Sequence, residues 1–209
     1  MLRDIRNNYR KYELNENELS NNPIDLFDLW LKEALEENVV EPTVMVLSSV
    51  SDGQPDSRVV LLKELSAEGF VFYTNYLSTK GDQINENPRV ALNFFWAEVE
   101  RQVRVRGVAV KLGVDQARKY FETRPRDSQL GACASEQSAE VRSREELEAK
   151  FLEFERRYVD QSVPMPEYWG GYLVKPSEVE FWQGRPGRLH DRILYFQEEG
   201  KWRFKRLQP

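Results

Sequence analysis

The chain contains a single histidine, His190, in a segment that also carries a tryptophan and three arginines. Trp182 precedes the histidine, and Arg185, Arg188 and Arg192 surround it. An imidazole titrates near neutral pH, and guanidinium groups carry a fixed positive charge that binds anions. This segment is therefore a candidate site for orienting an ionisable substrate. The alternative is a histidine in a surface turn beside solvated arginines.

Two other segments carry groups that bind anions. Arg58 and Lys63 stand at the two ends of an apolar stretch and would lie roughly 16 Å apart in a strand. Because side chains alternate along a strand, these two cations should face opposite sides and bind different anions. The alternative is a buried strand with solvated ends. Ser78, Thr79 and Lys80 precede a predicted short helix, whose first amide groups favour a phosphate.

The segment from Tyr120 to Ser128 combines hydroxyl and guanidinium groups around Pro125, which must interrupt a helix. Such a set of donors, one tyrosine hydroxyl, two guanidiniums and one serine hydroxyl, suits a phosphate dianion. The alternative is a helix end whose arginines pair with nearby acids. Gln102 shares one strand face with two further arginines, for which ion pairing or solvation is the simplest interpretation.

The pattern of apolar residues predicts strands joined by turns, with helices inserted between them. Asn22 and Pro23 suit the N-cap and first turn of a helix that runs to about residue 38. Strands are expected at 43–50, 57–63, 70–74, 89–97, 101–112, 171–174, 179–182, 192–197 and 202–207, and further helices at 80–87, 114–123 and 144–158. The first three strands read as a meander. We expect a mainly β, antiparallel barrel with peripheral helices, in one domain over residues 22–209, preceded by a mobile arm over residues 1–21.

Composition excludes several classes of protein. The chain has 209 residues, 40% of them hydrophobic, and a net charge of −5, which argues against general nucleic-acid binding. No apolar run is long enough to span a bilayer. One cysteine and one histidine provide neither a disulfide nor a zinc ligand set. With no signal-peptide pattern at the N-terminus, we expect a cytoplasmic protein without a metal.

Taken together, several distinctive segments resemble the pyridoxine/pyridoxamine 5'-phosphate oxidase family. The resemblance covers nearly the whole chain and rests on Arg58-Val-Val-Leu-Leu-Lys63, Phe72-Tyr-Thr74, Glu100-Arg-Gln-Val103, Arg124-Pro-Arg-Asp-Ser-Gln129, Glu136-Gln-Ser138, Glu180-Phe-Trp-Gln-Gly184 and Arg188-Leu-His-Asp-Arg192. It implies an FMN-binding split β-barrel and a homodimer with two active sites shared between the subunits.

The resemblance also implies roles for individual residues. FMN would be bound by Arg58, Val59, Val60, Leu61, Leu62, Lys63, Tyr73, Thr74, Thr79, Lys80, Gln102, Trp182 and Arg192, and by Gln137 and Ser138 from the partner chain. The substrate would be bound by Arg6, Tyr9, Lys63, Tyr120, Arg124, Ser128, Arg188 and His190, the last two also being the catalytic residues. Thr79 stands where the family often has a basic residue, and Glu41 where an aspartate is common.

The implied reaction oxidises pyridoxamine 5'-phosphate or pyridoxine 5'-phosphate to pyridoxal 5'-phosphate, with FMN as cofactor and dioxygen as acceptor, and releases hydrogen peroxide. The flavin carries out the redox chemistry, while the protein binds two phosphates and orients the pyridine. One rival is a non-catalytic carrier or sensor of FMN or pyridoxal phosphate. A second rival is a flavin reductase acting on another substrate, against which the phosphate set at Tyr120, Arg124 and Ser128 counts.

Overall fold

A computed structural model describes residues 2–4 and 7–209 of the chain. Its strands are β1 Val44–Ser51, β2 Gln54–Leu61, β3 Glu64–Ser66, β4 Gly69–Asn75, β5 Arg89–Trp96, β6 Arg101–Lys111, β7 Trp169–Gln183, β8 Asp191–Glu198 and β9 Lys201–Arg206. Its α-helices are α1 Pro23–Glu36, α2 Thr79–Glu86, α3 Val114–Thr123, α4 Arg126–Ala134 and α5 Arg144–Arg157. Short 3-10 turns lie at Leu2–Asp4, Glu16–Glu18, Ala97–Val99 and Pro186–Arg188.

The strands of this described part form one antiparallel sheet in the order β2-β1-β5-β6-β7-β4-β3, with β8 and β9 added beside β7. The segment after β2 joins the two ends of this order. Leu62 donates its backbone N–H to Thr43 beside β1, and Lys63 donates to Val71 in β4. The sheet therefore curls into a barrel, which confirms the predicted mainly β fold with peripheral helices.

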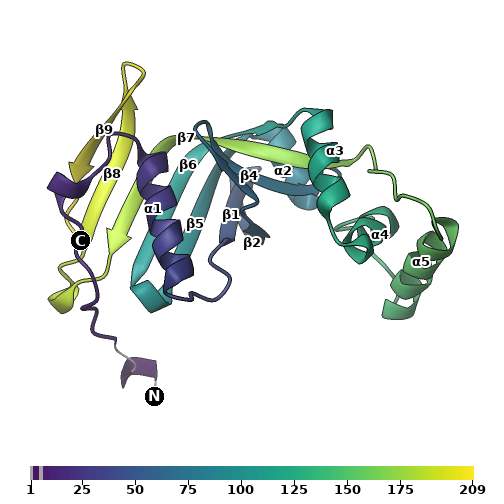
Figure 1. Ribbon diagram of the computed structural model, residues 1–209, viewed down its shortest axis with the longest axis horizontal. Coiled ribbons are helices and arrows are strands. Elements are labelled where there is room, and N and C mark those ends of the chain that lie inside the picture. The colour runs from purple at the N-terminus through teal and green to yellow at the C-terminus, as the bar shows by residue number, and fades with distance from the viewer. Residues whose placement is uncertain (1, 5–6) are drawn as a thin grey trace.

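Helix α1 lies against the sheet and closes the main core (Figure 1). Its Asn22 cap accepts a hydrogen bond from the backbone N–H of Ile24, as the sequence predicted. Phe27 meets Phe70 and Phe94 edge to face, at centroid distances of 4.9 and 4.8 Å. This aromatic packing fixes the helix over the barrel.

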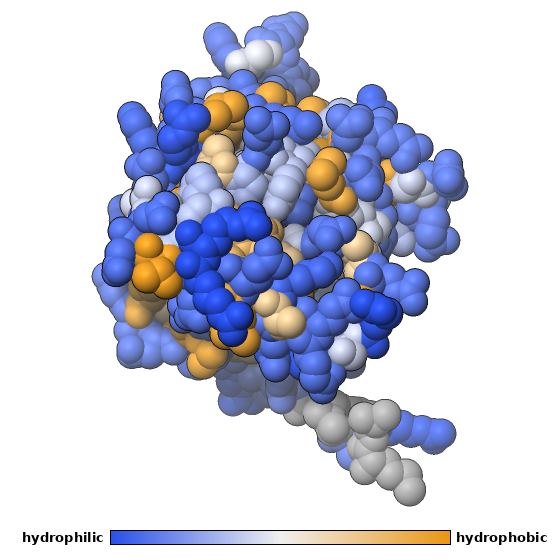
Figure 2. Space-filling model, turned by 90° about the vertical axis from the view of Figure 1, so that its right-hand side faces the viewer, coloured by the Kyte–Doolittle hydropathy of each residue, from blue (hydrophilic) through white to orange (hydrophobic). Residues whose placement is uncertain are grey.

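Helices α3, α4 and α5 gather at the end of the molecule opposite β8 and β9 (Figure 1). Phe121, Leu130, Val163 and Trp169 form a second small core there. Phe151, Phe154 and Tyr158 of the predicted α5 stripe pack against it. Seen from this end, the surface is mainly hydrophilic with separate hydrophobic patches (Figure 2). Among the described helices, none is both long and apolar enough to cross a membrane.

The structure corrects three local predictions. The third strand does not complete a meander, because β4 pairs with β7 and with the unpredicted β3. The strands expected at 171–174 and 179–182 are one strand, β7. Pro176 lies within it because the register to β6 shifts at that point, where no ladder hydrogen bond from proline is needed. Finally, Pro125 ends α3 but also precedes the unpredicted α4.

Candidate functional site

A cavity of about 550 Å³ opens where β2, β4, α3, α4 and the start of β7 meet. Such a volume suits a small-molecule ligand. Its lining comprises Val59, Val60, Leu61, Lys63, Tyr73, Thr74, Asn75, Lys80, Tyr120, Arg124, Ser128, Gly131, Ala132, Ser135, Gln137 and Trp169. The cavity thus brings together predicted FMN residues and the whole predicted phosphate set for the substrate.

Three parallel aromatic rings form one wall of this cavity. Tyr73 stacks on Tyr120 with centroids 3.9 Å apart and lies parallel to Trp169 at 5.4 Å. The Tyr73 hydroxyl donates to Glu64 Oε1 at 2.5 Å, and Gln116 of α3 donates to Glu64 Oε2 at 3.2 Å. Burial and this carboxylate raise the pKa of Tyr73. Glu64, which sequence analysis missed, therefore anchors the wall to both β3 and α3.

In the described part of the chain, the guanidinium of Arg124 in the cavity has an unused hydrogen-bond donor that could bind an anion. The guanidinium of Arg124 lies over the Trp169 ring at 4.8 Å and over Phe121 at 5.5 Å. Its Nη1 is buried and has no hydrogen-bond partner among the described residues. Burial lowers the pKa of Arg124, as expected for a cation whose charge lacks a counter-charge. An anionic ligand would supply the missing acceptor.

A second cavity of about 320 Å³ adjoins the first and shares Asn75 and Gln137 with it. Gln137 Oε1 accepts hydrogen bonds from Thr74 at 3.3 Å and from Lys80 at 3.1 Å. The backbone N–H of Thr79 donates to Ser138 Oγ at 3.2 Å. These contacts lie within one chain, because the segment after α4 returns to the start of α2. The supply of Gln137 and Ser138 to FMN from the partner chain stays a prediction.

Arg58 and Lys63 occupy different places, in agreement with the alternation of side chains. Lys63 lines the first cavity, whereas Arg58 does not. The Arg58 guanidinium instead binds Ser49 at 2.6 Å and Gln83 at 2.7 Å. The side chain of Leu62 belongs to the main core, so only its backbone could reach a ligand. Contact between Leu62 and FMN therefore stays a prediction for its backbone, because barrel closure turns its side chain inward.

The histidine segment forms a second group of predicted site residues. His190 packs against Trp182 at a centroid distance of 4.7 Å, and Tyr9 meets both rings edge on at 5.6 and 5.8 Å. His190 is half-buried by these ring contacts, although Arg188 and Leu189 before it are exposed. Arg188 is exposed and has a φ of 65°. A left-handed arginine costs about 1 kcal/mol, and such strain concentrates at functional sites.

Arg192 is held by its own chain. Its Nε and Nη2 both lie 2.8 Å from Glu180 Oε1, and its Nη1 donates to the Gln208 carbonyl at 2.9 Å. Glu180 also accepts from Arg104 at 3.2 Å. Sequence analysis did not assign Glu180 this contact with Arg192, although its cross-strand place opposite Arg104 offered a signal.

The two groups are far apart within one chain. Trp169 in the cavity wall and Trp182 beside His190 stand near opposite ends of β7, roughly 40 Å apart at strand spacing. Figure 1 agrees, since α3 and α4 lie at one end of the molecule and β8 at the other. Gln102 lies opposite Trp182 but bonds to Asn93 at 2.7 Å.

Asn93, the hydrogen-bond partner of Gln102, lies on the side of Gln102 that faces the first cavity. It pairs with Val46, which pairs with the cavity residue Val59, two strand spacings or roughly 10 Å away. Gln102 therefore lies between the two groups of predicted site residues.

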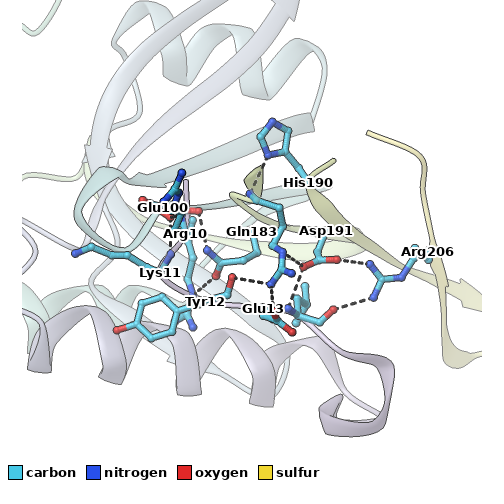
Figure 3. A network of polar contacts seen from close by, with 12 residues as sticks. Arg10, Lys11, Tyr12, Glu13, Glu100, Gln183, His190, Asp191 and Arg206 are labelled. Atoms are coloured by element: carbon cyan, nitrogen blue, oxygen red, sulfur yellow. Dashed lines mark hydrogen bonds and ion pairs between the residues drawn. The ribbon is translucent and has the colours of Figure 1, made fainter. Parts of the chain in front are cut away.

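The N-terminal arm is bound to the histidine segment by a polar network (Figure 3). Glu100 accepts the backbone N–H groups of Arg10 at 2.7 Å and Lys11 at 3.0 Å. Arg206 binds Glu16, the Leu14 carbonyl and Asp191. Because they fix the backbone next to Tyr9, these contacts hold the Tyr9 ring against Trp182. Arg6, also predicted to bind substrate, lies outside the described residues, and the mobility of the arm stays a prediction.

Family models match both parts of the chain. Residues 31–158 match the model described as "Pyridoxamine 5'-phosphate oxidase" and residues 169–209 match the "Pyridoxine 5'-phosphate oxidase C-terminal dimerisation region". The chain belongs to the pyridoxamine 5'-phosphate oxidase family. The resemblance inferred from its motifs is confirmed.

Relatives with this family's name match over the full chain. Proteins named pyridoxine/pyridoxamine 5'-phosphate oxidase from Haemophilus influenzae and Rubrobacter xylanophilus are 52% and 51% identical over 209 residues, covering 100% of this chain and 99% and 96% of theirs. Among solved structures, PhzG from Burkholderia lata has a TM-score of 0.89 at 31% identity, covering 92% of this chain and 95% of its own. A related FMN-binding protein from Nostoc punctiforme, at 17% identity and a TM-score of 0.73, covers 91% and 100% and supports the fold.

Proposed function

We propose that this protein oxidises pyridoxamine 5'-phosphate and pyridoxine 5'-phosphate to pyridoxal 5'-phosphate, with FMN as cofactor and dioxygen as the final acceptor. The observation that carries the proposal is the unpartnered, buried Nη1 of Arg124 in a cavity that also presents Lys63, Tyr120 and Ser128. These groups supply charge and hydroxyl donors for a phosphate ester. Relatives that are 50–52% identical over the full chain bear the name of this activity.

The residues present fit FMN as well as substrate. Lys80 is half-buried, and burial together with Arg58 lowers its pKa, so an anion nearby would stabilise its charged form. Val59 and Leu61 offer exposed apolar surface for a flat ring, with fractional exposures of 64% and 38%. Arg58, Thr74, Thr79, Lys80, Gln137 and Ser138 surround the place proposed for the cofactor's phosphate and sugar chain. When bound, FMN supplies the redox chemistry by accepting a hydride.

The reaction removes two hydrogens from the substrate. The C4' carbon loses a hydride, and its hydroxyl or amino group loses a proton. Pyridoxine phosphate then becomes the aldehyde directly, whereas the imine from pyridoxamine phosphate adds water and releases ammonia. Dioxygen takes up the two electrons and two protons and leaves as hydrogen peroxide.

The chain's own residues would bind and orient the substrate. Lys63, Tyr120, Arg124 and Ser128 would hold its phosphate, which fixes the distance of the pyridine from the cavity wall. Arg188 and His190 would contact the pyridine on its other side, and Tyr9 would cover it. Fixed cations around the site would also stabilise the negative charge that develops during hydride transfer.

A complete site would require two chains. In one chain, the phosphate-binding residues and the His190 segment lie near opposite ends of β7, and even the cavity residue Val59 is four strand spacings, roughly 20 Å, from Glu180 beside that segment. This separation is too large for a single small ligand. The C-terminal residues 169–209, which match a dimerisation region, include Trp182, Arg188, His190 and Arg192. We therefore propose a homodimer with two sites, each pairing the cavity of one subunit with the histidine segment of the other.

Two experiments test these proposals. Anaerobic addition of pyridoxamine 5'-phosphate to the FMN-loaded protein should bleach the flavin band, and a band that stays unchanged would favour the carrier or sensor. At a substrate concentration far below the KM of either variant, mixing and refolding Arg124→Ala with His190→Ala should raise activity above that of both variants alone, to about a quarter of the wild-type value, because half of the dimers would contain one intact site. A site within one chain would recover none.

A further inference from the structure

The backbone N–H of Arg185 donates a hydrogen bond to Nδ1 of His190 over 3.1 Å (Figure 3). A neutral imidazole has a proton on only one nitrogen, so a ring that accepts at Nδ1 carries its proton on Nε2. Burial and the charge of Arg188 lower the pKa of His190, and Asp191 opposes them. The neutral ring therefore presents an N–H donor at Nε2.

The side chain of the same Arg185 holds the N-terminal arm. Its Nη1 lies 2.5 Å from Glu13 Oε1 and 3.4 Å from the Tyr12 carbonyl, and its Nε lies 3.7 Å from Asp191 Oδ2. Asp191 in turn accepts the backbone N–H of Leu14 at 3.2 Å. One residue thus connects the arm through its side chain and the imidazole through its backbone.

The packing around these contacts leaves the histidine little freedom. The Tyr9 ring of the arm lies against His190 and also covers Gly184, where an added Cβ would stand 2.6 Å from Tyr9 Cγ. Displacing the arm would remove Tyr9 from the face of His190. The position of Arg185 therefore depends on the arm, and the orientation of His190 depends on Arg185.

We propose that Arg185 is a positioning residue that fixes His190 as its Nε2–H tautomer and couples this orientation to the docked N-terminal arm. His190 then acts as a hydrogen-bond donor to an acceptor atom on the substrate ring and does not act as a general base, because Nε2 already carries the proton. The role toward substrate rests on the proposed oxidase function, whereas the tautomer and its dependence on Arg185 do not.

Because His190 is the only histidine in the chain, selective ¹⁵N-histidine labelling of the untagged, full-length holoprotein gives one unambiguous ring. At pH 7.5 we expect the Nε2 resonance to show a directly bonded proton and the Nδ1 resonance to show none. Arg185→Ala should produce a mixture of both tautomers and raise the His190 pKa toward 6.5. Arg185→Lys keeps a cation for Glu13 and should restore most of the wild-type spectrum.

The kinetic experiment measures turnover of pyridoxamine 5'-phosphate by the same variants. Arg185→Ala should raise KM about three- to tenfold, the range for one neutral hydrogen bond, with a smaller effect on kcat. Glu13→Gln, a change on the exposed arm that leaves the core intact, should shift the spectrum and KM in the same direction. Arg203→Ala removes an exposed arginine that lies 3.7 Å from Glu198 in β8 and should change neither.

The histidine spectrum tests the positioning by Arg185, and turnover tests the oxidase function. A proton on Nδ1 in the wild type, or an unchanged histidine spectrum in both Arg185→Ala and Glu13→Gln, would overturn the proposal even if the enzyme is active. The predicted spectra without any turnover would leave the positioning by Arg185 intact and would instead refute the oxidase function.

Discussion

Replacing Arg124 by glutamine should weaken substrate binding but leave the free energy of unfolding nearly unchanged. The guanidinium lines the cavity and its buried Nη1 has no partner among the described residues. A charged hydrogen bond to phosphate contributes about 1.5–3 kcal/mol, so Arg124→Gln should weaken binding of pyridoxamine 5'-phosphate by about 10- to 150-fold. Non-phosphorylated pyridoxamine should bind equally weakly to both proteins.

The stability of the ligand-free protein should respond differently. An unsatisfied buried donor costs about 1–3 kcal/mol, whereas the stacking of Arg124 on Trp169 contributes about 0.5–2 kcal/mol. These opposing terms nearly cancel, so Arg124→Gln should change the free energy of unfolding by less than about 1 kcal/mol. Chemical denaturation without ligand measures this difference.

Arg126 provides a matched control because it lies two residues away but does not line the cavity. Its guanidinium donates to the carbonyls of Tyr158 at 2.5 Å and Gln161 at 2.9 Å. Arg126→Gln should therefore lower stability and leave substrate affinity unchanged. Titrations of FMN and substrate decide the outcome. If Arg124→Gln lost FMN affinity and kept substrate affinity, our division of the two phosphate sites would be refuted.

Three further predictions follow from other contacts. Gly184→Ala should displace the Tyr9 ring, since the added Cβ would lie 2.6 Å from Tyr9 Cγ, and should raise KM with normal FMN content; Gly113→Ala, in open space, is the control. Glu64→Ala frees the Tyr73 hydroxyl and should weaken FMN binding about three- to tenfold in a fluorescence titration. Glu64→Gln keeps an acceptor and should bind FMN nearly as the wild type does. Equal losses of affinity in the two variants would contradict this role of Glu64. The hydrogen bond from Arg206 lowers the pKa of Glu16 from 4.5 to about 2, so Glu16 stabilises the folded state fully above pH 4.5 and loses this effect as the pH falls through about 2. Glu16→Gln should therefore be less stable than the wild type at neutral pH by under about 1 kcal/mol, with the difference vanishing near pH 2 in acid denaturation.

Local signals were sufficient for much of the fold. The caps at Asn22 and Ser78 predicted the starts of α1 and α2, and both side chains accept the expected backbone N–H groups. Alternation of apolar residues predicted most strands, and side-chain parity separated Arg58 from Lys63. These predictions succeeded because caps, turns and strand faces depend on residues that are neighbours in the sequence.

The sequence by itself also identified the chemistry of the site, because its distinctive segments carry the family resemblance. Only the tertiary structure decided which of those segments meet. The pairing of β4 with β7, the continuity of β7 through Pro176 and the packing of α4 place Arg124 beside Tyr73 and leave His190 at the far end of the sheet.

The same limit explains why the sequence did not indicate the roles that we propose for Glu64 and Arg185. Glu64 matters because barrel closure brings it to the Tyr73 hydroxyl, and Arg185 because the arm returns across the end of β7. Such contacts join residues that are distant in sequence, and they depend on the closure of the whole sheet. A local sequence pattern does not predict the closure of the sheet, because the free energy that stabilises the closed sheet comes from burying the common core.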